Sequence, residues 1–243
     1  MADTTEPQVH QLDGPALLLA APGTGKTYQL ARRIKYLVEE RKFDPGTITV
    51  ITFTAAAAAN MRARLSDHRK PELCVSRELQ PGLICTMHSL GYRVIRENIA
   101  MLDLAAVPTV VHANRTRLIL MGDAAQLAGY RREDAKETRS CRQFGRCRPD
   151  DSQKCKICAA YGSILRSCGA IDYDDQILLS CRILRNNPEV AQSFRARSRH
   201  LLVDEYQDIN AGQFELIKAL SQGQDSGLFV VGVACPSSLV QLL

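Results

Sequence analysis

A short segment near the N-terminus carries residue types that bind phosphate. Residues 20–27 read AAPGTGKT and match the phosphate-loop pattern G-x-x-x-x-G-K-[ST], except that alanine takes the place of the first glycine. Gly23 and Gly25 let the backbone turn its N–H groups toward a phosphate. Lys26 is then placed to reach the β and γ phosphates, and the Thr27 hydroxyl is a ligand for Mg²⁺. The candidate nucleotide contacts are Ala21, Pro22, Gly23, Thr24, Gly25, Lys26 and Thr27.

A second candidate site consists of adjacent acids. Residues 201–208 read LLVDEYQD, an apolar run that ends on Asp204 and Glu205. Asp204 is placed to hold Mg²⁺ through water, and Glu205 to act as general base on the water that attacks the γ-phosphate. Alone, such a pair indicates a solvated loop, just as AAPGTGKT alone could be a glycine-rich turn. Together, at the ends of what we expect to be neighbouring strands, they predict a nucleoside triphosphatase core.

Four of the nine cysteines lie in one basic stretch, with the spacing C-x5-C-x7-C-x2-C. Their thiolates could close a structural zinc site or hold an iron–sulfur cluster, and the alternative is a set of unliganded surface thiols. Little else would order this polar segment, which favours zinc. The segment would then present arginines to DNA phosphate. The cysteines are Cys141, Cys147, Cys155 and Cys158, and the arginines are Arg139, Arg142, Arg146 and Arg148.

The elements that position these residues alternate between strands and helices. Short apolar runs predict strands, and apolar residues at helical spacing follow each of the first three runs. This alternation predicts an α/β fold with a parallel sheet. The expected strands are residues 15–20, 47–53, 83–86, 200–203 and 228–232, and the expected helices are 28–41, 55–65, 89–98, 174–185 and 213–220.

The middle of the chain breaks that alternation. Residues 114–127 and 159–166 are expected to be helical, whereas residues 131–156 are polar and charged. We therefore expect residues 104–172 to be an inserted helical subdomain with a cysteine-rich basic loop. The main domain would consist of residues 1–103 and 173–243.

Composition excludes several classes of protein. The 243 residues carry a net charge of +5 and are 45% hydrophobic, which excludes a fibrous or wholly disordered chain. We expect no membrane span and no secretory signal, because no apolar run approaches the roughly 18 residues that a span needs. The expected location is the cytoplasm or nucleoid, where cysteines stay reduced.

Five segments together resemble the UvrD/Rep-like superfamily 1 DNA helicases in order and spacing. The resemblance covers residues 14–232 and implies a RecA-like P-loop lobe that binds ATP and single-stranded DNA, with a helical subdomain inserted into it. By that pattern Asp204 is the Mg²⁺ carboxylate, Glu205 the catalytic base and Gln207 a neighbour of the γ-phosphate. The segments are AAPGTGKT (20–27), VITFTAAAAANMRARL (50–65), CTMHSLGYRVIRE (85–97), IDYDD (171–175) and LLVDEYQDIN (201–210).

The resemblance also implies four DNA contacts: Thr52, Phe53, Thr86 and His88. Phe53 is suited to stacking on a base, although it could equally be a core strand residue. His88 could instead be a structural histidine. Three further acids, Asp172, Asp174 and Asp175, could be imagined as a metal site, but acids at the start of a helix are favoured by its dipole.

The sequence departs from the family pattern in several places. Ala55 and Ala56 stand where Asn-Lys is usual, and neither Gln8 nor Gln11 can be assigned as the adenine-reading glutamine. Residues 233–243 read VACPSSLVQLL, which departs from the family pattern, and we expect the chain to be the N-terminal half of a helicase without its second RecA-like lobe. We expect such a truncated lobe to bind nucleotide better than it hydrolyses it, because the second lobe would supply arginines to the ATP site. The alternative is a non-catalytic protein that only binds ATP or nucleic acid. A P-loop kinase is disfavoured, because DEYQD and TMHS have no role there.

Overall fold

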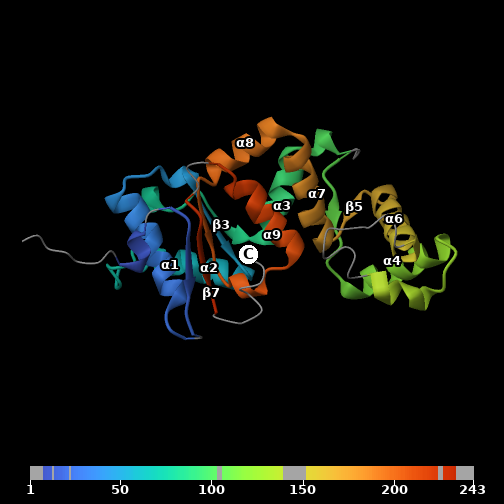
Figure 1. Ribbon diagram of the computed structural model, residues 1–243, viewed down its shortest axis with the longest axis horizontal. Coiled ribbons are helices and arrows are strands. Elements are labelled where there is room, and N and C mark those ends of the chain that lie inside the picture. The colour runs from blue at the N-terminus through green and yellow to red at the C-terminus, as the bar shows by residue number, and fades with distance from the viewer. Residues whose placement is uncertain are drawn as a thin grey trace, which may run out of the picture. The chain divides into compact units, whose positions relative to one another are not determined.

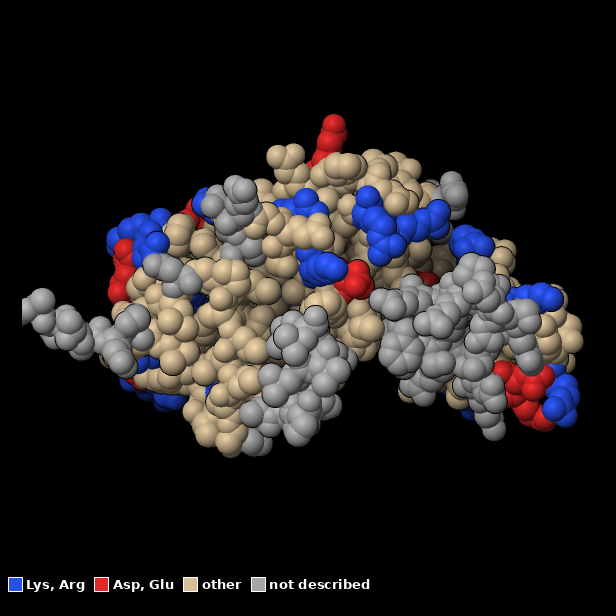
Figure 2. All heavy atoms as spheres, in the orientation of Figure 1, with Lys and Arg blue, Asp and Glu red and all other residues tan. Residues whose placement is uncertain are grey.

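A computed structural model describes residues 8–12, 14–21, 23–102, 106–138, 152–223 and 227–233. The chain folds as two compact units (Figure 1). The first consists of Met1–Met87, Glu189–Ile209 and Leu220–Leu243, and the second of His88–Pro188 and Asn210–Ala219. Residues 104–172, the expected insertion, lie inside the second unit, which also includes residues 88–103, 173–188 and 210–219. On the face drawn in Figure 2, basic and acidic side chains form small separate groups on both units.

A parallel sheet is the centre of the first unit and confirms the expected α/β fold. Its five strands have the order β1-β7-β6-β2-β3, and every neighbouring pair is parallel. We expected the strand before the phosphate loop and the strand before Asp204 to be neighbours in the sheet. This expectation is wrong, because β7 lies between β1 and β6. The strands are β1 (Ala16–Leu19), β2 (Ile48–Thr52), β3 (Leu83–Thr86), β6 (His200–Val203) and β7 (Phe229–Gly232).

The helices of this unit follow the strands as the alternation predicts. α1 (Lys26–Lys35) continues into a π-helical turn (Tyr36–Glu40), and α2 (Ala55–Leu65) begins at Thr54, whose hydroxyl accepts a hydrogen bond from the Ala57 amide at 3.0 Å. α8 (Pro188–Arg197) precedes β6. Short 3₁₀ helices cover Val9–Gln11, Pro45–Thr47, Arg77–Leu79 and Tyr206–Asp208.

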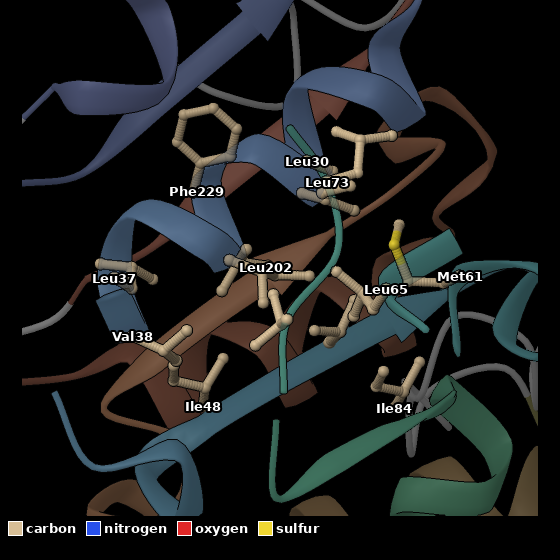
Figure 3. Packing of buried hydrophobic residues seen from close by; sticks show 14 of the residues in the cluster. Leu30, Leu37, Val38, Ile48, Met61, Leu65, Leu73, Ile84, Leu202 and Phe229 are labelled. Atoms are coloured by element: carbon tan, nitrogen blue, oxygen red, sulfur yellow. The ribbon is translucent and has the colours of Figure 1, made fainter. Parts of the chain in front are cut away.

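Leucines and isoleucines of α1 and α2 form a core with side chains from the sheet (Figure 3). Leu30 and Ile34 of α1 are completely buried, as are Met61 and Leu65 of α2. Every residue of β2, β6 and β7 is buried, so these strands are covered on both faces. Such burial fixes the strand ends from which the candidate site residues project.

The second unit is mainly helical. Its elements are α3 (Met87–Glu97, whose first residue belongs to the first unit), a 3₁₀ helix (Ile99–Met101), β4 (Thr109–Val110), α4 (Asn114–Leu127), a 3₁₀ helix (Arg132–Thr138), α6 (Ser152–Ser167), β5 (Ala170–Ile171), α7 (Tyr173–Asn186) and most of α9 (Ala211–Ser221). The sequence did not indicate the parallel pair β4 and β5, because two-residue strands carry no periodicity. α4 and α6 share an apolar core that includes Met121, Ile157 and Tyr161.

Two helices of the second unit approach closely at a glycine. A Cβ atom on Gly91 of α3 would lie 2.3 Å from the Gln176 carbonyl oxygen of α7. No other residue type fits this crossing without a backbone shift. Among the described residues, no helix is both long enough and apolar enough to cross a membrane.

Candidate nucleotide-binding site

The loop between β1 and α1 has the conformation that a phosphate loop needs. Gly23 and Gly25 have φ angles of +78° and +86°, in the left-handed region that side chains disfavour. A Cβ on Gly23 would meet nothing within 4 Å, so the need for glycine is conformational rather than steric. The Thr24 hydroxyl donates to the Ala21 carbonyl at 2.6 Å and closes the loop. Pro22 lies outside the described residues.

Lys26 opens α1 and folds back over the loop. Its side chain is buried, and Nζ lies 3.4 Å from the Ala21 carbonyl oxygen. A buried ammonium with one long neutral contact keeps most of its hydrogen-bonding capacity for an anion. The N-terminus of α1 adds its dipole at the same point. Loop, lysine and helix therefore form an anion site.

Thr27 connects the phosphate loop to the acidic loop. Its hydroxyl donates to the Asp204 carboxylate at 3.4 Å, across 177 residues of sequence. Asp204 follows β6, and its carboxylate also accepts the Glu205 amide at 3.0 Å. Burial, and then the charge of Glu205, raise the pKa of Asp204. A hydroxyl beside a buried carboxylate is the hard-oxygen donor set that suits Mg²⁺.

Glu205 is held in an unusual backbone conformation beside Asp204. Its φ angle is +51°, which is uncommon for a residue with a side chain. Its carboxylate accepts a hydrogen bond of 2.7 Å from the Gln207 side-chain amide. The oxygen of that amide accepts the Val233 N–H at 2.9 Å, just beyond β7. Gln207 therefore links the acidic loop to the end of β7.

The end of β7 lies between the two loops. The Gly232 carbonyl accepts the Ala20 amide at 3.1 Å, at the start of the phosphate loop. On its other side, a Cβ added to Gly232 would lie 3.1 Å from the Gln207 side-chain oxygen. The sequence analysis did not predict that Gly232 lies between the two loops. The sequence signal for it was an apolar run that ends in glycine.

Three of the four candidate DNA contacts lie at the carboxyl edge of the first unit's sheet. Phe53 directly follows β2 and is 56% exposed, so it is not a core residue. Thr52 is buried, and its hydroxyl donates to the Thr54 carbonyl at 3.0 Å. Thr86 pairs with Thr52 in register and is half-buried. Phe53 is the side chain of this group that is available to a ligand.

His88 belongs to the second unit. Its ring packs edge-on against Tyr173, with centroids 5.3 Å apart. Burial lowers the pKa of His88, which favours the neutral ring. These contacts are those of a histidine that packs within its unit.

The cysteine cluster is only partly described. Cys141 and Cys147 lie outside the described residues, as does the side chain of Cys155. Cys158 is buried on α6. Among the residues described, no group of three or more His, Cys, Asp or Glu could hold a metal ion. Zinc therefore stays a prediction without support from the structure.

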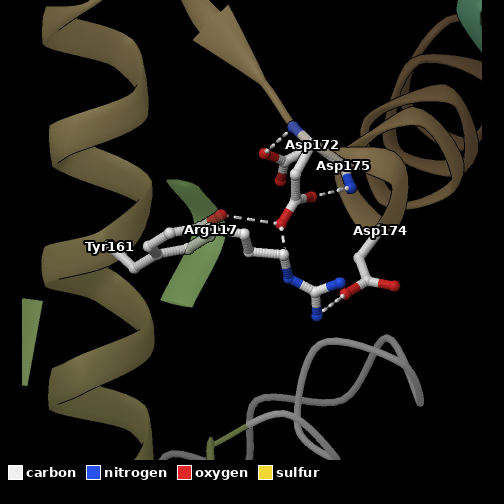
Figure 4. Close-up of polar contacts among 5 residues, drawn as sticks. All are labelled: Arg117, Tyr161, Asp172, Asp174 and Asp175. Atoms are coloured by element: carbon white, nitrogen blue, oxygen red, sulfur yellow. Dashed lines mark hydrogen bonds and ion pairs between the residues drawn. The ribbon is translucent and has the colours of Figure 1, made fainter. Parts of the chain in front are cut away.

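The acids near residue 172 stabilise the start of a helix (Figure 4). Asp172 is the N-cap of α7, and it exchanges side-chain-to-amide hydrogen bonds with Asp175 in a capping box. The Asp172 carboxylate also accepts the Tyr161 hydroxyl at 3.0 Å and lies 3.6 Å from Arg117 Nε. Arg117 reaches Asp174 at 2.9 Å as well. The structural interpretation of these acids is confirmed.

Comparisons with known proteins show the family of the chain. The UvrD/REP helicase N-terminal domain family matches residues 1–233. The chain is 32% identical to "ATP-dependent DNA helicase UvrD1" of Mycobacterium leprae, covering 87% of this chain and 29% of that protein. It is 30% identical to "ATP-dependent DNA helicase Rep" of Escherichia coli, covering 92% and 34%. It thus spans about a third of the length of the curated relatives it matches. With nearly its whole length matched, the chain belongs to the UvrD/REP helicase N-terminal domain family.

Proposed function

We propose that this chain is the ATP-binding lobe of a DNA helicase, which couples ATP hydrolysis to movement along single-stranded DNA when a second RecA-like lobe is supplied. The observation that carries the proposal is the contact between Thr27 and Asp204, which unites the phosphate loop and the acidic loop. The relatives named ATP-dependent DNA helicases support it. Movement in the 3′ to 5′ direction and action at the cytoplasmic nucleoid belong to the same proposal.

The nucleotide would lie on the phosphate loop, with Lys26 near its β and γ phosphates. Thr27 and Asp204 would hold Mg²⁺, which neutralises phosphate charge when bound. Glu205 would accept the proton of the attacking water, and Gln207 would keep its carboxylate in place through their 2.7 Å hydrogen bond. Backbone N–H groups of the loop would also contact the phosphates, and they come from Ala21, Gly23, Thr24 and Gly25. Pro22 is part of the same loop but has no N–H group to donate.

DNA would lie along the carboxyl edge of the sheet. An exposed phenylalanine beside a strand end offers a face on which a base can stack, and such stacking contributes about 1–3 kcal/mol per base. Phe53 is that side chain, with 56% of its surface exposed. Thr86 would contact the backbone nearby, whereas buried Thr52 would position the loop. His88 as a further DNA contact, and residues 104–172 as an inserted subdomain, belong to the same proposal.

ATP turnover with and without single-stranded DNA tests the proposal, together with binding of a fluorescent ATP analogue. Glu205→Gln should lower turnover by about 10²–10⁴-fold while binding persists, because it removes a general base. Glu72→Gln is the matched control, since Glu72 is exposed and distant in sequence from both loops. Binding without any turnover even when a second lobe is supplied would favour the alternative, a non-catalytic protein that only binds ATP or nucleic acid. Absence of nucleotide binding would overturn the proposal.

A further inference from the structure

The second unit contains a pocket of about 390 Å³ that the proposed function does not use. α6, β5, α7 and the turn after α3 all contribute to it. Asp175, Leu179 and Arg182 of α7 are spaced four and three residues apart, so they share one helix face. The apolar lining includes Met101, Leu102, Leu165, Ile171 and Leu179.

A glycine keeps part of this pocket open. Gly162 lies in the interior of α6 and lines the pocket. A Cβ there would meet nothing nearer than Arg166 Nη1 at 3.5 Å, an ordinary contact. Alanine would therefore fit, and it favours a helix over glycine by about 1 kcal/mol. Glycine is the weaker choice for the helix, and what it provides is room in the pocket.

The charged groups of the pocket favour an anion. Arg166 and Arg182 are both exposed, and Arg166 Nη2 donates to the Ser163 hydroxyl at 3.0 Å. The acid of the lining, Asp175, accepts the Asp172 amide at 3.3 Å. It also lies in the first turn of α7, where the helix dipole favours a negative charge. The two guanidinium groups are therefore placed for a ligand's carboxylates.

We propose that this pocket docks an acidic segment of a partner protein, with one apolar side chain in the pocket and neighbouring carboxylates on Arg166 and Arg182. Arginine and methionine are enriched at protein interfaces, and methionine adapts its shape to a guest. Basic side chains appear in Figure 2 over the part of this unit where Figure 1 labels α7.

Two other occupants fit less well. A small molecule is usually enclosed over most of its surface, whereas Met101 at this pocket is 52% exposed. A nucleic acid base stacks on aromatic side chains, and the described lining contains none. An anchor side chain on a longer segment needs only part of the volume of about 390 Å³.

The test uses the 243-residue chain and the fluorescein-labelled peptide Asp-Asp-Leu-Phe-Asp-Asp, with binding followed by fluorescence anisotropy. Two reference peptides are compared with it. In the first, lysines replace the four aspartates, and in the second, Ser-Gly replaces Leu-Phe. We expect both references to bind at least about tenfold more weakly, as for loss of an interface anchor. Equal binding of all three peptides, or no binding of the first at about 1 mM, would overturn the proposal.

Variants then locate the binding. Gly162→Leu should weaken it about tenfold by filling the pocket, whereas Gly162→Ala should change it less than about twofold and melt no lower than the parent chain. Arg166→Glu combined with Arg182→Glu should also weaken it about tenfold. If Gly162→Leu does not fold, the Arg166→Glu and Arg182→Glu double variant still tests whether the peptide binds at this pocket, because both arginines are exposed. Unchanged affinity in the arginine pair, or displacement of the peptide by a single-stranded oligonucleotide, would contradict the proposal.

Discussion

Each unit contains an aspartate that is buried immediately after a parallel strand, and the two have different surroundings. Asp204 follows β6 and has a threonine hydroxyl at 3.4 Å. Asp172 follows β5 and has a tyrosine hydroxyl at 3.0 Å, an arginine at 3.6 Å and a helix amide at 2.8 Å. The charge of Asp172 is matched by a cation within the unit. The charge of Asp204 lies beside Glu205, a second acid, which helps to raise its pKa.

This difference separates a structural carboxylate from one suited to a ligand. Burying a charge is unfavourable unless it is paired and hydrogen-bonded. Arg117 and the capping box provide that pairing for Asp172, so the unit needs no further partner there. Asp204 has weaker compensation, and a cation bound between it and Thr27 would supply the rest. Two predictions test this contrast, and a third concerns a buried histidine on the strand that precedes Asp204.

The largest effect is expected from Asp172→Ala. The change removes one of the two carboxylates that pair with Arg117 and the acceptor of the hydrogen bonds from the Tyr161 hydroxyl and the Asp175 amide. Loss of a buried, hydrogen-bonded member of an ion pair costs about 3–5 kcal/mol of unfolding free energy. Urea denaturation followed by circular dichroism measures this change. Asp123→Ala is the matched control, because Asp123 pairs with Arg132 at the surface, where pairs contribute about 0–1 kcal/mol. Similar losses in the two variants would remove the distinction between buried and exposed pairs.

A smaller effect is expected at the other end of β6, where a histidine is buried. His200 is buried against Phe43, with ring centroids 4.2 Å apart, and among the described residues neither ring nitrogen has a hydrogen-bond partner. Burial, then the charges of Arg199, Arg33 and Arg41, lower the pKa of His200 to about 4. The unfolded chain then binds the proton more readily than the folded chain between about pH 6.5 and pH 4.

Unfolding free energy should therefore fall as the pH drops through that window, by at most about 3 kcal/mol from this group. His200→Leu should flatten the dependence, measured as urea midpoints at several pH values. His68→Leu should not, because His68 is exposed. A slope that survives His200→Leu unchanged would assign the pH dependence to other groups.

The local chemistry of the sites could be predicted from sequence, but the contacts across the fold could not. The phosphate loop, the acidic loop and the parallel strands have residue patterns that reflect local backbone and burial requirements. The position of β7 has no such pattern, because strand order depends on how the connections cross the sheet. Arg117 is 57 residues from Asp174, and no spacing rule relates them. The burial of Thr52 and the exposure of Phe53 likewise depend on where β2 ends.

The smallest effect on folding should come from Asp204→Asn, and its small size distinguishes Asp204 from Asp172 most sharply. The amide oxygen can still accept the Glu205 N–H, and the amide nitrogen can donate to the Thr27 hydroxyl in place of the present bond. Because the change also removes a buried charge, we expect the unfolding free energy to change by less than about 1 kcal/mol. Binding of an ATP analogue in Mg²⁺ should weaken about tenfold or more, since metal-orienting carboxylates contribute about 10–100-fold to affinity. In EDTA the variant and the parent chain should bind alike. Asp67→Asn, at an exposed pair with Arg69, should bind like the parent in both buffers. If Asp204→Asn instead lost several kcal/mol of stability and kept its Mg²⁺ dependence, both aspartates would be structural, and the contact between Thr27 and Asp204 would no longer support a nucleotide site.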